Sequence, residues 1–216
     1  MKINLESKRL CIFGLPGEGK SNLLCWLISR YGSRAFIYDT MHEYPDDQPF
    51  DVYRPADRYS VPEMEKVLKL VVKLAGRKRY KLVAIDEASR FAPSKPHPLP
   101  QILGEINDCC RHIEYNNLTP VFIARRPTQL NQDLTELAHY LIIFNLKGKN
   151  DIDYLESFAA GLGEVVFHLK PFHFVLVNQR REFTIFNPVP EMPMLKKTNS
   201  GRTPLQTPST CLILAN

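Results

Sequence analysis

The fold is decided by the stretch "RLCIFGLPGEGKSNLLCWLISRYG", Arg9 to Gly32. It begins with a short apolar run, continues through a loop that holds three glycines, and ends in a segment with helical hydrophobic period. The loop "GLPGEGKS", Gly14 to Ser21, fits the pattern G-x-x-x-x-G-K-[ST]. A strand before this pattern and a helix after it disfavour a chance glycine turn, so the stretch predicts a phosphate-binding loop.

The residue types of this loop suit a nucleoside triphosphate. Glycines let the backbone curl so that successive N–H groups point at phosphate oxygens, and the following helix adds its positive N-terminal end. Lys20 supplies a cation to the β- and γ-phosphates, and the hydroxyl of Ser21 is a ligand for Mg²⁺. We therefore expect ATP and Mg²⁺ as cofactors. The loop residues expected to bind the nucleotide are Gly14, Pro16, Gly17, Glu18, Gly19, Lys20, Ser21 and Asn22.

Around this loop, short β-rich apolar runs alternate with segments of helical period, which predicts an α/β fold with a mostly parallel central sheet flanked by helices. The expected strands are "RLCIFG", "RAFIYD", "KLVAID", "PVFIAR" and "YLIIFNL", and a late pair, "EVVFHLK" and "FHFVLVNQ", is expected to form a C-terminal β-hairpin. The expected helices are "SNLLCWLISRYG", "VPEMEKVLKLVVKLAG" and "QILGEINDCCRHIEY".

Length and composition indicate one domain. A chain of 216 residues that is 44% hydrophobic can bury a single sizeable core, which we place at residues 1–187. Residues 188–216 are rich in Pro, Ser and Thr without apolar period and are expected to be a disordered tail. The net charge of +5 permits a polyanionic partner but carries little weight by itself.

Cysteine usage and hydropathy indicate a cytoplasmic protein. The five cysteines are odd in number and show no C-x-x-C spacing, which disfavours a disulfide framework or a zinc site. Cys109 and Cys110 fall on the apolar face of a helix and are interpreted as small core residues. The N-terminus lacks the apolar core of a signal peptide, and runs such as "YLIIF" are too short to insert into a membrane.

Acidic residues follow two of the expected strands. Asp86 ends "KLVAID", where it can reach the magnesium shell, and Glu87 stands next to it as a candidate general base. Asp39 and Glu43 follow "RAFIYD", at the same sheet edge if the strands are parallel. They border the nucleotide or water site or, equally, Asp39 caps a turn while Glu43 faces solvent. The predicted metal ligands are Ser21 and Asp86.

The order of the P-loop, the Asp39/Glu43 segment, "IDEA" and "IARRPTQL" resembles the HerA and FtsK superfamily of DNA-pumping P-loop ATPases. That resemblance implies a RecA-like (ASCE) fold with a strand inserted between the P-loop strand and the Asp86 strand. It also implies a catalytic glutamate next to Asp86 and a polar sensor at the end of the next strand. The family usually has a glutamine where this chain has Arg125, which leaves Gln129 as a weaker substitute, while Arg126 and Pro127 match. Both arginines are candidate catalytic residues together with Lys20 and Glu87.

Because the P-loop begins at Gly14, the resemblance is closest to the compact genome-packaging ATPases of membrane-containing icosahedral viruses. It implies a homo-oligomeric ring, expected to be a hexamer, that pumps double-stranded DNA into a capsid and contacts capsid or portal-vertex proteins. Such a protein would lie in the host cytoplasm or in the virion. Arg126 is the first candidate for an arginine that acts on the neighbouring subunit, and Arg111 is the second.

Fewer sequence features bear on the DNA contacts and on the alternative functions. The basic segments Gly76–Lys81 and Lys147–Asn150 are candidate DNA contacts or solvated surface, and Ser89–Pro100 is a candidate moving loop after Glu87. One alternative is a cellular or plasmid translocase of the same superfamily, or a phage-assembly ATPase. Another is a nucleotide-binding regulator without turnover, which has no need of a base at Glu87. A small-molecule kinase is disfavoured because no Arg-rich lid segment is seen between the late strands.

Overall fold

In the computed structural model, which describes residues 4–45, 48–77, 79–108 and 118–192, eight strands form one sheet in the order β3-β2-β4-β5-β1-β6-β7-β8. The strands are β1 Leu10–Phe13, β2 Ala35–Tyr38, β3 Asp51–Tyr53, β4 Leu82–Ile85, β5 Thr119–Ala124, β6 Tyr140–Phe144, β7 Phe174–Asn178 and β8 Phe183–Phe186. All pairings from β3 to β6 are parallel, whereas β6–β7 and β7–β8 are antiparallel.

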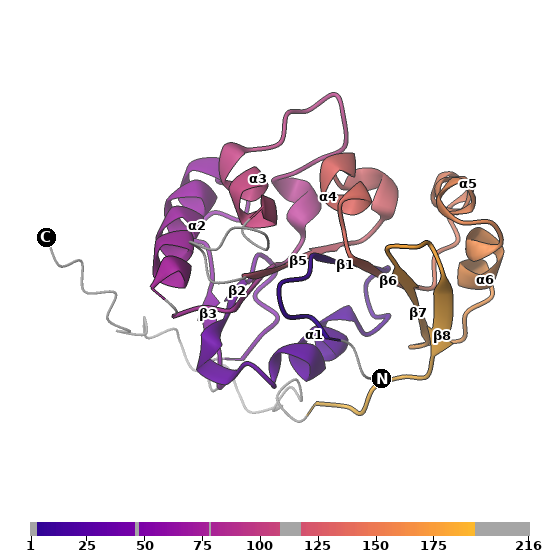
Figure 1. The fold of residues 1–216 in the computed structure, drawn as a ribbon, viewed down its shortest axis with the longest axis horizontal. Helices are drawn as coiled ribbons and strands as arrows, with labels where there is room; N and C mark the ends of the chain where they lie inside the picture. Colours follow the sequence, from indigo (N-terminus) through magenta and orange to yellow (C-terminus); the bar gives the residue numbers. More distant parts are fainter. Residues whose placement is uncertain (1–3, 46–47, 78, 109–117, 193–216) are drawn as a thin grey trace, which may run out of the picture.

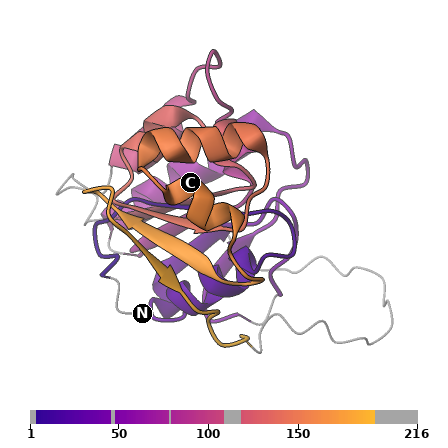
Figure 2. The same cartoon turned by 90° about the vertical axis from the view of Figure 1, so that its right-hand side faces the viewer.

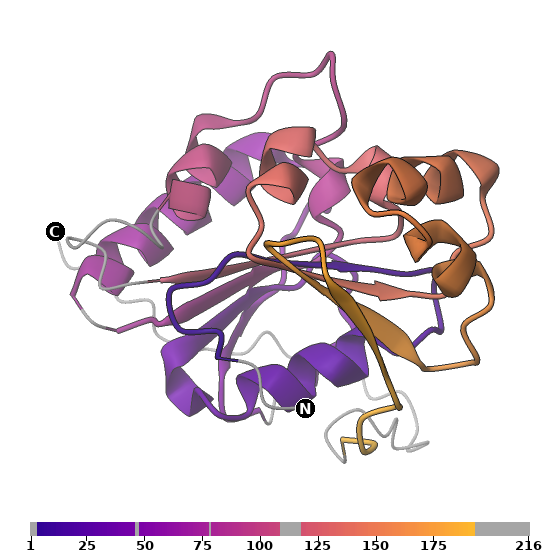
Figure 3. The ribbon, with the colours of Figure 1, turned by 45° about the vertical axis from the view of Figure 1, so that its right-hand side comes forward.

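The central strands are apolar along almost their whole length because both faces of the sheet are covered. Every residue of β1, β2, β4 and β5 is buried. One face packs against α1, and the opposite face packs against α2 to α6 (Figures 1 and 3). The helices are α1 Lys20–Ile28, α2 Val61–Gly76, α3 Gln101–Asp108, α4 Gln132–Glu136, α5 Lys149–Phe158 and α6 Leu162–Phe167.

Local signals account for the helix boundaries. Ser60 caps α2 by accepting a hydrogen bond from the N–H of Glu63 at 3.2 Å, with a proline in the first turn. Gly19 begins α1 at φ 100°, a left-handed conformation that favours glycine. The helix ends at Ile28, short of the predicted Gly32.

The predicted fold class is confirmed, and so are the five central strands. The hairpin exists, but "EVVFHLK" is not one of its strands: these residues fall largely in α6, and the hairpin pairs β7 with β8 (Figure 2). Its Val and Phe residues have β-propensity, yet Val166 is buried in the same cluster as Leu162, a spacing of four that suits a helix. The sequence did not predict β3, α4 or α5. None of the described helices is long and apolar enough to cross a bilayer.

The topology gathers functional candidates at one edge. Since β1 to β6 run in the same direction, their carboxyl ends meet there, and β5 lies between β1 and β4 as the resemblance implied. Gly14, Asp39, Asp86, Arg125 and Asn145 each follow the end of one of these strands. We call this the carboxyl edge of the sheet.

Some predictions fall outside the described residues, namely those on Cys109, Cys110, Arg111, Cys211 and residues 193–216. The boundary at residue 187 stays a prediction. Just beyond it, the side chain of Asn22 in α1 contacts two backbone groups: its Nδ2 donates to the carbonyl of Pro190 at 3.1 Å, and its Oδ1 accepts from the N–H of Met192 at 2.7 Å. Residues 188–192 therefore dock against α1.

Candidate nucleotide-binding site

The P-loop is built around backbone conformations that only glycine adopts without strain. Gly17 has φ 85° and Gly19 has φ 100°, and a Cβ at Gly17 would meet nothing within 4 Å. The first N–H groups of α1 have no partner within the helix, and the residue that begins the helix provides no side-chain cap. The loop therefore offers open space beside unpaired N–H donors, which is the arrangement that binds phosphate.

Lys20 lies at the centre of a charged cluster. Its Nζ donates to the carbonyl of Leu15 at 3.0 Å, within its own loop. Burial lowers the pKa of Lys20, and the nearby carboxylates of Asp86, Glu87 and Glu43 oppose that shift. The ammonium group is thus partly desolvated and held among negative charges, ready to exchange a carbonyl partner for a phosphate.

Asp86 is the most perturbed carboxyl group of the site. Burial raises its pKa to about 7, and the negative charges of Glu43, Asp39 and Glu87 add to the shift. Its Oδ1 accepts a hydrogen bond from the N–H of Glu87 at 3.0 Å, and its carbonyl accepts one from Thr40 Oγ1 at 2.7 Å. The carboxylate is therefore fixed in place within an excess of negative charge.

Asp39 and Glu43 divide their roles between the two alternatives. Asp39 is fully buried, and its two carboxylate oxygens accept from the N–H groups of Glu43 at 3.0 Å and Tyr44 at 3.2 Å. It shapes the turn, as a capping residue does. Glu43 instead reaches the P-loop, because its Oε2 accepts a hydrogen bond from Ser21 Oγ at 2.6 Å.

These donors fit a magnesium ion. Mg²⁺ prefers hard oxygen ligands, and in nucleotide sites it takes one or two protein ligands plus phosphate oxygens and water. Ser21, Glu43 and Asp86 supply a hydroxyl and two carboxylates. Burial, and after it the nearby negative charges, raise the pKa of Asp86, and a bound divalent cation would favour its charged form. Within the described ranges, no group of three or more His, Cys, Asp or Glu side chains is arranged to hold a metal by itself.

Glu87 has a strained backbone and a specific partner. Its φ of 48° and ψ of 43° lie in the left-handed region, which a non-glycine residue occupies at a cost. Its Oε1 accepts from Arg125 Nε at 3.0 Å, so the first arginine after β5 is paired with the candidate base at the end of β4. In this state Arg125 restrains Glu87.

Arg126 points elsewhere. Its Nε lies 3.7 Å from Oδ2 of Asp151 in the first turn of α5, and Asp151 Oδ1 accepts from Thr128 Oγ1 at 2.6 Å. The side chain of Arg126 is 47% exposed, whereas that of Asp151 is 2% exposed. The backbone of Arg126 is extended, as the following Pro127 predicted. A buried carboxylate thus anchors an exposed guanidinium.

The loop after Glu87 is connected to the segment that carries these arginines. Ala92 accepts from the N–H of Asn131 at 2.9 Å, and the N–H of Ser94 donates to the carbonyl of Gln129 at 3.1 Å. Gln129 itself is exposed, and its backbone makes this contact. A shift at Glu87 would therefore be felt by the residues that follow β5.

The opposite flank of the P-loop is aromatic, and the sequence analysis missed it. A Cβ on Gly14 would lie 2.8 Å from Cβ of Phe144 at the end of β6. A Cβ on Gly19 would lie 3.4 Å from Cδ1 of Phe172. The dipeptide Pro171-Phe172, in a turn before a strand, was the signal available for it.

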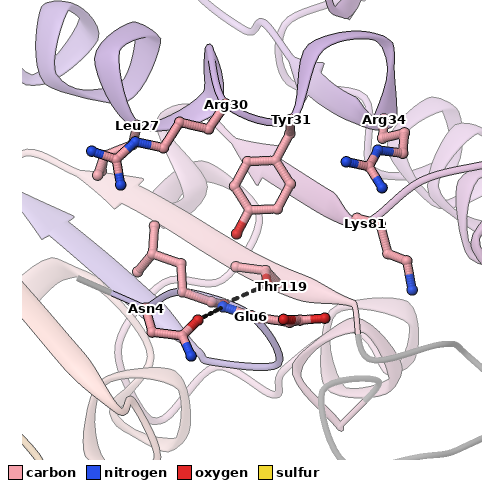
Figure 4. A pocket seen from close by; sticks show the side chains of 9 residues that line it. Asn4, Glu6, Leu27, Arg30, Tyr31, Arg34, Lys81 and Thr119 are labelled. Atoms are coloured by element: carbon pink, nitrogen blue, oxygen red, sulfur yellow. Dashed lines mark hydrogen bonds between the residues drawn. The ribbon is translucent and has the colours of Figure 1, made fainter. Parts of the chain in front are cut away.

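One described hollow lies apart from this site. It has a volume of about 290 Å³ and lies at the amino edge of the sheet, away from the P-loop (Figure 4). Arg30, Arg34 and Lys81 line it together with Glu6. Lys81 is the end of the predicted basic segment Gly76–Lys81, of which Lys78 lies outside the described residues. In the other segment, Lys147–Asn150, the last two residues begin α5.

The fold is similar to that of solved packaging enzymes. The genome-packaging NTPase B204 of Sulfolobus turreted icosahedral virus 2, solved with ATP-γS, superposes with TM-score 0.70 at 19% identity, over 87% of this chain and 100% of that chain. B204, the DNA-packaging ATPase of Sulfolobus turreted icosahedral virus, superposes with TM-score 0.68 at 16% identity, over 86% of this chain and 100% of that chain.

A bacterial domain shares the fold more distantly. The N-terminal domain of zonular occludens toxin from Neisseria meningitidis gives TM-score 0.54 at 11% identity, over 84% of this chain and 94% of that chain. No protein-family model and no curated protein matches the sequence. At these identities the likeness is one of fold, and it establishes that this chain has the fold of a P-loop NTPase.

Proposed function

We propose that this protein is a Mg²⁺-dependent ATPase that translocates double-stranded DNA, as the motor that packages a viral genome into its capsid. One observation carries the proposal: the P-loop lysine, a buried aspartate and a glutamate restrained by an arginine converge at the carboxyl edge of one sheet. The fold shared with two packaging enzymes of icosahedral viruses supports the choice of substrate and partner.

The chemistry follows from the residues in place. The N–H groups of Gly17 to Ser21 and the Lys20 ammonium bind the phosphates, while Ser21, Asp86 and Glu43 would hold Mg²⁺, which supplies Lewis-acid neutralisation of phosphate charge when bound. Glu87 is the base for the attacking water. Because Glu87 is paired with Arg125, hydrolysis requires Arg125 to leave the carboxylate, and a γ-phosphate is the competing anion that would draw it away.

Arg126 is suited to a neighbouring subunit in a ring. Its side chain is exposed, and its Nε is paired with Asp151, which is held in turn by Thr128. The side chain can therefore reach outward in a fixed direction. An arginine supplied across an interface stabilises charge that develops on the transferred phosphoryl group, and it couples one subunit's hydrolysis to its neighbour's position. The ring, its DNA and any capsid contact are parts of this proposal.

An ATPase assay with and without duplex DNA tests the function. We expect Mg²⁺-dependent turnover that DNA stimulates, and loss of about 100-fold or more in the Glu87→Gln variant, since general-base catalysis contributes about 10²- to 10⁴-fold. ATP binding by Glu87→Gln should persist. A wild type that binds ATP without turnover in the presence of DNA would contradict the motor and indicate a nucleotide-dependent regulator.

The role of Arg126 is tested by mixing subunits. Arg126→Ala and Lys20→Ala are each expected to be inactive alone, because one lacks the donated arginine and the other lacks phosphate binding. In a mixed ring, a Lys20→Ala subunit still donates Arg126 to an Arg126→Ala neighbour whose P-loop is intact. Activity should therefore return in mixtures. Mixtures as inactive as the separate variants would show that Arg126 acts within its own subunit, and an Arg126→Ala variant that is active alone would show that it has no role.

A further inference from the structure

The aromatic flank of the P-loop contains an exposed ring in an unfavourable backbone position. Phe172 is 53% exposed and has φ 63°, in the left-handed region. It is the third residue of a turn that the N–H of His173 closes on the carbonyl of Lys170 at 3.1 Å, with Pro171 in second place. A turn with proline second and positive φ third usually has glycine or asparagine there. Phenylalanine at this position therefore strains the chain without burying its ring.

The turn is nevertheless held firmly. Asn145, a buried residue just after β6, donates from Nδ2 to the carbonyls of Val166, Phe167 and Leu169 at 3.2, 3.1 and 3.1 Å. These contacts fix the segment that leads into the turn, and β7 begins at Phe174 directly after it. The ring of Phe172 is thus presented from a rigid base toward Gly19, whose Cβ position lies 3.4 Å from its Cδ1.

The charges of the site decide which part of a nucleotide faces this ring. Asp86, Glu87 and Arg125 all follow β4 or β5, which lie on one side of β1. Magnesium and the terminal phosphates belong on that side, beside Lys20. The uncharged nucleoside must then leave the P-loop toward β6 and β7, where Phe172 is an exposed ring whose Cδ1 lies 3.4 Å from the Cβ position of Gly19.

We infer that Phe172 is a stacking platform for the base of the bound nucleotide, an inference that rests on the proposed ATP site. An aromatic ring stacks on any nucleobase because every base has a π-face, so the platform contributes affinity without selecting adenine. The strained turn fits this role, since a backbone outlier that adds nothing to the core is retained where a ligand uses it.

Calorimetric titration with two ligands tests the platform, in the presence of Mg²⁺. ATP carries a base, whereas inorganic tripolyphosphate offers the same phosphates without one. Phe172→Gly removes the ring and suits the positive φ, so it should unfold at the same temperature as the wild type or higher. We expect it to bind ATP and GTP about 5- to 100-fold more weakly and tripolyphosphate unchanged. Phe172→Tyr should restore ATP binding.

The control is Ile185→Ala, at a residue of β8 that is also 53% exposed, which should change neither affinity. If the wild type binds both ligands, and Phe172→Gly weakens the binding of both equally or of neither, the stacking proposal is wrong while the proposed ATP site is retained. If the wild type binds neither ligand, the proposed function fails and the platform fails with it.

Discussion

The two flanks of the P-loop are built on opposite principles. On the side of β4 and β5, carboxylates and arginines crowd together, the pKa of Asp86 is raised to about 7 and Glu87 has a left-handed backbone. On the side of β6 and β7, Phe144 and Phe174 are buried with ring centroids 5.5 Å apart, and Phe174 stacks on Phe186 at 5.6 Å. In the polar flank, crowded charges and backbone strain lower the stability of the fold, whereas the buried rings of the aromatic flank raise it.

The largest expected effect on stability lies in the aromatic flank. Phe174→Ala removes a ring that is 1% exposed between two other rings, and truncation of a buried phenylalanine costs about 3–5 kcal/mol. Urea unfolding should show a loss of that size, while Ile185→Ala on the neighbouring strand should change the free energy of unfolding by less than about 1 kcal/mol. Equal losses in the two variants would break the comparison.

The next largest effect is a gain in the free energy of unfolding, and it depends on pH. Asp86 has an ordinary pKa of 3.8 when exposed and about 7 in the fold, so the folded state binds the proton more tightly. The ionisation of Asp86 does not change the free energy of unfolding below about pH 4, lowers it increasingly as the pH rises toward 7, and keeps it lowered above that. Asp86→Asn, which keeps an oxygen acceptor for the N–H of Glu87, should therefore raise stability at pH 8 by on the order of a few kcal/mol.

Chemical unfolding of Asp86→Asn and wild type at pH 5 and pH 8 measures this. The groups that surround Asp86 and shape its titration are Glu43, Asp39 and Glu87. The gain at pH 8 should exceed the gain at pH 5, and hydrolysis should be lost because the metal needs a carboxylate. A gain that is the same at both pH values would show that burial and like charge are not the cause.

The smallest effect is expected from the contact that holds Glu87. Arg125 is 40% exposed at its side chain, and ion pairs at such positions contribute about 1 kcal/mol or less. A double-mutant cycle of Arg125→Ala with Glu87→Gln should give a coupling free energy in that range, because the proposed mechanism requires Glu87 to change partners during turnover. A coupling free energy above about 2 kcal/mol would mean that the pair is structural.

Much of the polar flank was predictable because its residues adjoin strand ends. The motif "GLPGEGKS" and the pair Asp86-Glu87 each follow an apolar run directly, so their place at the carboxyl edge follows from strand direction. The partner of each group was not predictable. That Arg125 pairs with Glu87, Arg126 with Asp151 and Ser21 with Glu43 depends on side chains brought together from distant parts of the chain.

The segment "EVVFHLK" shows the limit of local pattern. Its β-branched residues predicted a strand, but the helix α6 formed because Leu162 and Val166 bury one face in the core beside α5. Phe172 was missed for a similar reason. Nothing in "LKPFHF" says that its ring meets Gly19, which is 153 positions earlier in the sequence (172 − 19).

By itself, the sequence determined the five central strands, the glycine-rich loop after the first of them and the place of the acidic pair, because hydrophobic period, glycine spacing and strand ends are local properties. Only the tertiary structure decided which flank of the P-loop is charged and which is aromatic. That division depends on the strand order β4-β5-β1-β6-β7, which places residues far apart in the chain beside one loop. Strand order is set by packing over the whole sheet, and no short stretch of sequence contains it.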